Sequence, residues 1–247
     1  MKARRPLVIA NWKLNGGIDL ICSSVLSFTR PSITAQVAIA APYLYIRDLK
    51  NLLQNSDILA GSQNISEYDA GAYTGEISGA MLKESGANFC IIGHSERRQY
   101  FNETDTSCKT KVTSALKNQL LPVLCIGENE EEKDAGSTKE VLRRQLHDAL
   151  VGQDVSEQDV CIAYEPVWAI GTGKAATPET AQEVHAFIRE ELAAIFDQET
   201  AKGINILYGG SANKTNAAEL LSMADIDGLL VGGASLDPEH FATICSL

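Results

Sequence analysis

The sequence lacks the features that mark membrane-spanning, secreted and nucleic-acid-binding proteins. No apolar run approaches the roughly 20 residues of a membrane span. The basic start, Met1 to Arg5, is followed by a short apolar run, Leu7 to Ala10, that is too brief for a signal peptide. The sequence also has fewer basic residues (21) than acidic ones (32), which gives a net charge of −11. A surface of that charge repels nucleic acid and anionic lipid.

The cysteines form neither a disulfide framework nor a set with metal-ligand spacing. No CxxC pair is present, no histidine stands at ligand spacing, and several cysteines lie in apolar runs, where they behave as small buried hydrophobes. We therefore expect no metal site and a reducing, cytoplasmic compartment. The longest acidic run, Glu128 to Glu132, is interpreted as a solvated loop. The six cysteines are Cys22, Cys90, Cys108, Cys125, Cys161 and Cys245.

Eight short apolar runs recur along the 247 residues. They are rich in Val, Ile and Leu and do not alternate with polar residues, which is typical of strands covered on both faces. Segments with helical periodicity lie between them, the clearest beginning at Thr177-Pro178-Glu179, where a threonine cap precedes proline. The runs are Leu7–Ala10, Val37–Ala41, Ile58–Gly61, Phe89–Gly93, Leu121–Ile126, Val160–Tyr164, Ile204–Tyr208 and Gly228–Val231.

This alternation predicts an α/β fold. Eight strand–helix units in a chain of this length predict a (β/α)8 TIM barrel. The uniform composition, without any linker, predicts a single domain over residues 1–247. A doubly wound open sheet is the alternative, but such sheets usually stop at about five or six strands.

Chemically reactive side chains directly follow three of these runs. Asn11 and Lys13 follow the first run, His94 the fourth and Glu165 the sixth. In a parallel barrel the loops after the strands share one rim, so these side chains are expected to meet. Lys13 would be a fixed cation for an anionic substrate. Glu165, near apolar surface, is expected to have a raised pKa that suits a general base. Helix capping is the alternative interpretation of His94.

Glycine pairs follow the last two strands. Gly209-Gly210 precede Ser211, and Gly232-Gly233 follow the eighth run. Because glycine has no Cβ, backbone N–H groups in these loops can approach an anion closely. The two loops therefore predict a phosphate site, with two ordinary tight turns as the alternative.

The segment after Glu165 has the composition of a lid. Gly171 to Ala176 superficially match nucleotide-binding motifs, but Trp168 and Ala175 stand where a P-loop needs glycine and Ser or Thr. The segment has an apolar tip and starts at the predicted base, so we expect a hinged lid that excludes water. Its residues are Pro166, Val167, Trp168, Ala169, Ile170, Gly171, Thr172, Gly173 and Lys174.

Together these motifs resemble those of the triosephosphate isomerase family, in order and from about residue 8 to the C-terminus. Two positions depart from the family pattern: Leu14 stands where Met is frequent, and Ala212 where Val is frequent. Neither would contribute a reacting group. The resemblance is carried by Ala10–Lys13, Ile92–Arg98, Ala163–Lys174, Tyr208–Ser211 and Leu230–Ser235.

The resemblance implies interconversion of dihydroxyacetone phosphate and D-glyceraldehyde 3-phosphate, in glycolysis and gluconeogenesis, without metal or organic cofactor. Glu165 would then move a proton between neighbouring carbons, and neutral His94 would polarise the carbonyl. Asn11 and Lys13 would support the enediolate, with Glu96 as a supporting carboxylate. Phosphate would be held by Asn11, Lys13, Gly171, Ser211, Gly232 and Gly233.

Residues 64–78 show no helical or strand period, and structureless connections that long usually have a function. Their glycines allow a projecting hairpin and their tyrosines suit an interface, with a flexible surface loop as the alternative. The resemblance implies a homodimer. In it, Thr74 reaches toward the partner's Asn11 and the partner's Lys13, and Glu76 pairs with the partner's Arg97.

Two other functions stay open on the residues alone. A Schiff-base aldolase that uses Lys13 would be trapped by borohydride in the presence of its substrate. A non-catalytic sugar-phosphate binder would bind substrate without turnover.

Overall fold

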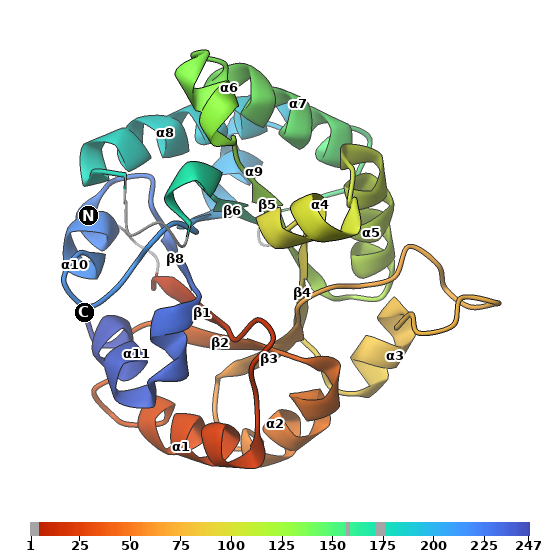
Figure 1. Ribbon diagram of the computed structural model, residues 1–247, viewed down its shortest axis with the longest axis vertical. Coiled ribbons are helices and arrows are strands. Elements are labelled where there is room, and N and C mark those ends of the chain that lie inside the picture. The colour runs from red at the N-terminus through yellow and green to blue at the C-terminus, as the bar shows by residue number, and fades with distance from the viewer. Residues whose placement is uncertain (1–4, 157–158, 171–175) are drawn as a thin grey trace.

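The computed structural model describes residues 5–156, 159–170 and 176–247. Its eight parallel strands close into a barrel in which each strand pairs with the next and β8 pairs with β1 (Figure 1). Every apolar run of the sequence overlaps one of them, which confirms the predicted (β/α)8 fold. The strands are β1 Leu7–Asn11, β2 Gln36–Ala41, β3 Leu59–Ser62, β4 Phe89–Ile92, β5 Leu121–Ile126, β6 Cys161–Tyr164, β7 Asn205–Tyr208 and β8 Gly228–Val231.

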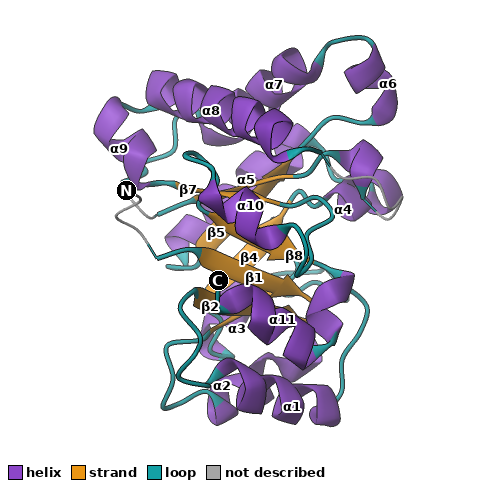
Figure 2. Cartoon of the chain, turned by 90° about the vertical axis from the view of Figure 1, so that its left-hand side faces the viewer, coloured by secondary structure: helices purple, strands orange, loops and turns teal. Residues whose placement is uncertain are grey.

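Helices surround the barrel as an outer layer (Figures 1 and 2). In the described part of the chain, none of them is both long enough and apolar enough to cross a membrane. The α-helices are α1 Ile18–Phe28, α2 Ile46–Leu52, α3 Gly79–Glu84, α4 Ser95–Phe101, α5 Asp105–Lys117, α6 Glu130–Asp134, α7 Thr138–Leu150, α8 Pro178–Ile195, α9 Gln198–Gly203, α10 Ala217–Ser222 and α11 Pro238–Cys245. Short 3-10 helices are η1 Tyr43–Tyr45, η2 Val167–Ala169 and η3 Gly233–Leu236.

Successive strand residues pack alternately inside the barrel and under the helices. In β1, Leu7 and Ile9 belong to the cluster that fills the barrel interior, whereas Val8 and Ala10 pack in the cluster shared with the helices. This is the two-residue period of a strand, with both faces covered. It explains why the strands appear in the sequence as unbroken apolar runs.

Local capping fixes where several helices begin. Thr177 accepts a hydrogen bond from the Thr180 N–H at the start of α8, with Pro178 at the first helical position, as the sequence predicts. The acidic run does not form the predicted solvated loop. Asn129 caps α6 in a reciprocal pair with Glu132, and Glu128, just before this cap, is buried.

Candidate active site

The predicted catalytic side chains meet at the C-terminal rim of the barrel, around a cavity of about 500 Å³. Asn11 ends β1, His94 stands between β4 and α4, and Glu165 directly follows β6. Among the described residues, no three His, Cys, Asp or Glu side chains gather as a metal site. The cavity is also lined by Lys13, Glu96, Ser211, Gly232 and Gly233.

Glu165 is buried and held by two donors. Its Oε1 lies 2.9 Å from His94 Nε2, and its Oε2 accepts the Ser95 N–H at 2.8 Å. Burial raises the pKa of Glu165, but the imidazole and the N–H outweigh it and leave the pKa below its ordinary value. The sequence prediction of a raised pKa is therefore wrong for this arrangement. Apolar residues before Glu165 do not reveal the donors that β4 and α4 bring to it.

His94 serves the site and a helix at once. Its Nδ1 accepts the Glu96 N–H at 3.2 Å, which caps the start of α4. An accepting nitrogen carries a lone pair, so the neutral ring has its proton on Nε2, the atom that faces Glu165. Burial lowers the pKa of His94, but the Glu165 carboxylate opposes it and the pKa lies above its ordinary value. The helix-capping interpretation of His94 is therefore confirmed, and the same ring lines the cavity beside Glu165.

Lys13 adopts a backbone conformation that non-glycine residues rarely adopt. Its φ is 51°, a strain of about 1–3 kcal/mol that persists only where the surroundings hold it. The Lys13 N–H donates to Asn11 Oδ1 at 3.1 Å, and its carbonyl accepts from Gln63 Nε2 at 2.8 Å. The ammonium lies 2.6 Å from Glu96 Oε1. These contacts fix the cation at the cavity wall, and Gln63 is a contributor that the sequence prediction missed.

The first glycine pair, Gly209-Gly210, lies too close to neighbouring side chains to carry side chains of its own. A Cβ on Gly209 would lie 2.9 Å from Glu165 Cγ, and one on Gly210 would lie 2.3 Å from the Tyr208 hydroxyl oxygen. A side chain at either position would displace Glu165 or Tyr208. These two glycines therefore shape the space around the carboxylate, a reason that the sequence prediction did not include.

The second glycine pair, Gly232-Gly233, follows the neighbouring strand β8 and lines the same cavity. A Cβ on Gly232 would stand 3.2 Å from Lys13 Cε, whereas one on Gly233 would meet no atom within 4 Å. Gly233 begins η3, and the first N–H groups of a helix have no partner within it. Ser211, Gly232 and Gly233 thus lie near one another and near the Lys13 cation, as a phosphate site requires.

The described part of the predicted lid contacts the barrel closely. Trp168 Nε1 donates to Glu128 Oε1 at 2.8 Å, and the Tyr164 hydroxyl donates to the same oxygen at 3.1 Å. The buried Ala169 accepts from Ser211 Oγ at 3.1 Å. The remaining predicted lid residues, Gly171, Thr172, Gly173 and Lys174, lie outside the described residues, as does the predicted phosphate contact of Gly171.

Glu128 is a site residue that the sequence prediction missed. Burial raises its pKa above the ordinary value, while the donors Trp168 and Tyr164 and the nearby Lys133 partly offset that rise. The sequence did contain a signal for this residue: Glu128 lies two positions after the end of β5, on the rim where Glu165 directly follows β6. Its place in an acidic run obscured that position.

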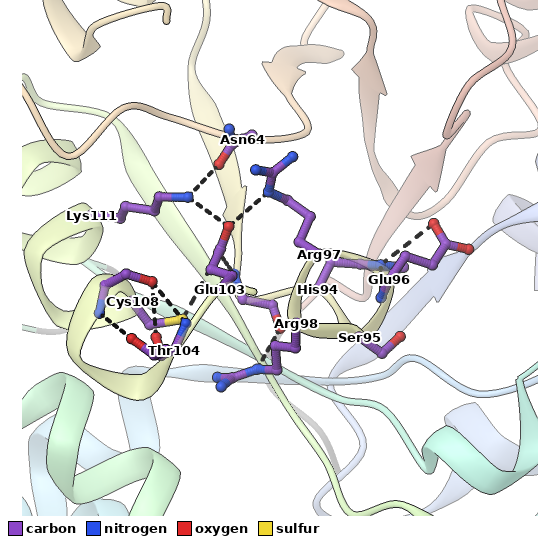
Figure 3. Close-up of polar contacts among 12 residues, drawn as sticks. Asn64, His94, Ser95, Glu96, Arg97, Arg98, Glu103, Thr104, Cys108 and Lys111 are labelled. Atoms are coloured by element: carbon purple, nitrogen blue, oxygen red, sulfur yellow. Dashed lines mark hydrogen bonds and ion pairs between the residues drawn. The ribbon is translucent and has the colours of Figure 1, made fainter. Parts of the chain in front are cut away.

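Behind His94 lies a buried charge cluster centred on Glu103 (Figure 3). The Glu103 carboxylate accepts from the Gly93 N–H at 2.6 Å, from Arg97 Nε at 2.7 Å and from Lys111 Nζ at 2.5 Å. Lys111 also donates to Asn64 Oδ1 at 2.8 Å. Burial raises the pKa of Glu103, but Lys111 and the other donors lower it below the ordinary value. The cluster joins the end of β4, helices α4 and α5, and the start of residues 64–78.

Comparison with known proteins points to one family. The sequence profile of triosephosphate isomerase matches residues 6–247. The triosephosphate isomerase of Nitrosococcus oceani is 48% identical over 247 residues, with 98% of each chain covered. That of Escherichia coli O1:K1 is 48% identical over 246 residues, covering 98% of this chain and 96% of the relative. The crystal structure of triosephosphate isomerase from Bartonella henselae superposes with a TM-score of 0.89 at 38% identity, with 98% of each chain covered.

Proposed function

This chain belongs to the triosephosphate isomerase family, and we propose that Glu165, His94, Lys13 and Asn11 carry out its reaction. The protein is an isomerase that interconverts dihydroxyacetone phosphate and D-glyceraldehyde 3-phosphate, the step of glycolysis that defines the family. One observation supports the assignment of roles most strongly. A buried carboxylate, an imidazole N–H and a fixed ammonium line the same cavity.

Glu165 is the proposed base. A substrate carbonyl that takes over the His94 Nε2–H and separates Glu165 from Ser95 removes the contacts that lower the pKa of Glu165. Burial then dominates and raises that pKa toward the range in which a carboxylate takes a proton from carbon. The C–H electron pair becomes the double bond of an enediolate, and the carboxylic acid returns the proton to the neighbouring carbon. His94 donates to the carbonyl oxygen through Nε2 and moves protons between the two oxygens.

Lys13 and Asn11 are the residues that we propose stabilise the negative charge of the enediolate, and Glu96 orients Lys13. The ammonium is already fixed at the cavity wall, so negative charge that develops on the enediolate oxygens meets a cation that needs little reorganisation. The ion pair with Glu96 orients Lys13 until an anionic substrate competes for it. We assign the substrate phosphate to Ser211, Gly232 and Gly233, together with Asn11, Lys13 and Gly171.

Pro166 to Lys174 form the proposed lid over this cavity. An enediolate phosphate exposed to water can lose inorganic phosphate and form methylglyoxal, so exclusion of water protects the product. The docking of Trp168 on Glu128 and of Ala169 on Ser211 supports this role for the described part of the segment.

We also propose a homodimer built through residues 64–78. This segment projects from the ring of helices between β3 and α3 (Figure 1), and residues 68–76 are all exposed. The rings of Tyr68 and Tyr73 stack with their centroids 3.6 Å apart, and this contact holds the two sides of the projecting segment together. Thr74 would then reach the partner's Asn11 and the partner's Lys13, and Glu76 would pair with the partner's Arg97.

An apolar groove of about 770 Å³ beside the active-site cavity supports the same assembly. It contains Leu14, Leu44 and Phe101, which are 97%, 82% and 65% exposed. Monomeric proteins rarely leave such a contiguous apolar surface in water. We further propose that residues 1–247 form a single domain and that the protein is cytoplasmic, in keeping with its six free cysteines.

The test of the proposed roles is turnover in deuterated water. A proton held on Glu165 exchanges with solvent, so deuterium should appear on the carbon of the product that receives it. Glu165→Gln should lose both turnover and deuterium incorporation. Trapping of substrate on Lys13 by borohydride would instead support Schiff-base chemistry and contradict the proposal.

A further inference from the structure

One basic residue, Lys133, directly follows the acidic run Glu128 to Glu132 and lies on α6. Its Nζ lies 3.3 Å from the centroid of the Trp168 ring. Helix α6 and the start of the predicted lid are therefore in direct contact, through a lysine that the reaction itself does not use.

The local sequence places Lys133 at this point. Asn129 and Glu132 exchange hydrogen bonds of 2.9 Å with each other's backbone N–H groups and so fix the start of α6 immediately after Glu128. The Glu128 carbonyl in turn accepts the Val167 N–H at 3.1 Å. The segment that begins α6 thus touches the backbone as well as the indole of the lid.

The two charged contacts of the indole match the two poles of an aromatic ring. The face of the ring is negative and attracts a cation, and its edge is positive and, at Nε1–H, donates to an anion. Lys133 occupies the face, and Glu128 Oε1 accepts at the edge. A tilt of the ring out of its present plane would weaken both contacts.

We infer that Lys133 is a positioning residue for the lid: with Glu128, it holds the Trp168 indole in one orientation and so keeps Pro166–Ile170 seated over the cavity. This inference rests on the lid role proposed above. Lys133 itself is exposed, and exposed cation–π pairs are weaker than buried ones. We therefore expect the contact to raise the population of the seated orientation by a factor of about 2–5.

The experiment compares three lysine variants in the intact enzyme. Lys133→Met removes the cation and keeps the length of the side chain, and Lys133→Arg retains a cation that also stacks on aromatic rings. Lys139→Met is the matched control. Lys139 lies on the next helix, α7, and its Nζ also faces an aromatic ring, 5.3 Å from the centroid of Phe187, but that ring does not belong to the lid. Trp168→Ala tests the lid role separately.

Two quantities are measured: the inorganic phosphate released per isomerisation, and the hydrogen exchange rate of the Trp168 indole N–H by NMR. The protein has only two tryptophans, and loss of one indole signal in Trp168→Ala assigns the other to Trp12. Lys133→Met should raise both quantities about 2–5-fold. Lys133→Arg should stay near the native values, and Lys139→Met should change neither.

The outcomes separate this inference from the lid proposal. If Trp168→Ala raises phosphate release but Lys133→Met behaves like Lys139→Met, the positioning role of Lys133 is wrong. The same holds if indole exchange rises in Lys133→Met while phosphate release does not, or if Lys133→Arg fails to retain the native values. If Trp168→Ala also leaves phosphate release unchanged, the lid role fails, and the inference fails with it.

Discussion

The buried carboxylate of Glu103 offers the sharpest stability prediction. Its side chain is 2% exposed, and that of its partner Lys111 is 6% exposed, so neither charge can be solvated if the other is removed. Glu103→Gln keeps the shape but leaves the Lys111 ammonium buried without its counter-charge. The amide also has one accepting oxygen in place of two, so at least one of the Gly93, Arg97 and Lys111 donors loses its partner.

The expected cost follows from these contacts. Removal of one partner of a buried ion pair typically destabilises a protein by about 3–5 kcal/mol. A lost hydrogen bond to a charged group alone would cost about 1.5–3 kcal/mol. We therefore expect Glu103→Gln to lose about 3–5 kcal/mol of unfolding free energy. Replacement of both partners, Glu103→Gln with Lys111→Met, should recover part of that loss because the buried ammonium is removed, whereas the remaining cation, Arg97, is partly exposed to water.

Urea unfolding at one fixed protein concentration measures this loss, since the stability of the proposed dimer would depend on concentration. The midpoint should fall in Glu103→Gln and rise again in the double variant, with little change in slope. A loss below about 1 kcal/mol, the range of an exposed pair, would contradict the buried-cluster interpretation. So would a double variant that is less stable than the single one.

Three further predictions follow from other parts of the structure. The stability difference between native protein and Glu103→Gln should be constant above about pH 5 and shrink as pH falls below about 4. This is expected because the folded-state pKa of Glu103 is lowered and its contribution is lost on protonation; urea midpoints across pH test it. Deletion of the lid tip, residues 168–170, should raise phosphate release per isomerisation, and an unchanged ratio would mean that the segment is only a connector. Shortening of residues 68–74 should give a monomer of much lower activity, and light scattering that finds native protein monomeric yet fully active would refute the proposed dependence.

The barrel could be predicted from sequence because its signal is local. Strands covered on both faces must be apolar at every position, so the runs are visible without any knowledge of their neighbours. The rim could be predicted for the same reason, since every residue that follows a strand of a parallel barrel shares one end. Asn11, His94 and Glu165 therefore met as predicted.

What the sequence did not reveal depends on contacts between distant segments. The lowered pKa of Glu165 comes from donors some 70 residues away in the chain, at His94 and Ser95. Glu128 and Glu103 are 2 of 32 acidic residues, and only the packing around them shows that they are buried. The reason for Gly209 likewise lies in Glu165, a side chain from a neighbouring strand.

The central claim is that Glu165 is the base of the isomerase reaction, and Glu165→Gln tests it most directly. The amide keeps the shape and the hydrogen-bonding reach but cannot accept the proton. A coupled assay of glyceraldehyde 3-phosphate consumption should show turnover lower by at least about 10²–10⁴-fold. Binding of a phosphate-bearing substrate analogue should change much less, and the exposed control Glu199→Gln should be unaffected. Near-native turnover in Glu165→Gln would contradict the account.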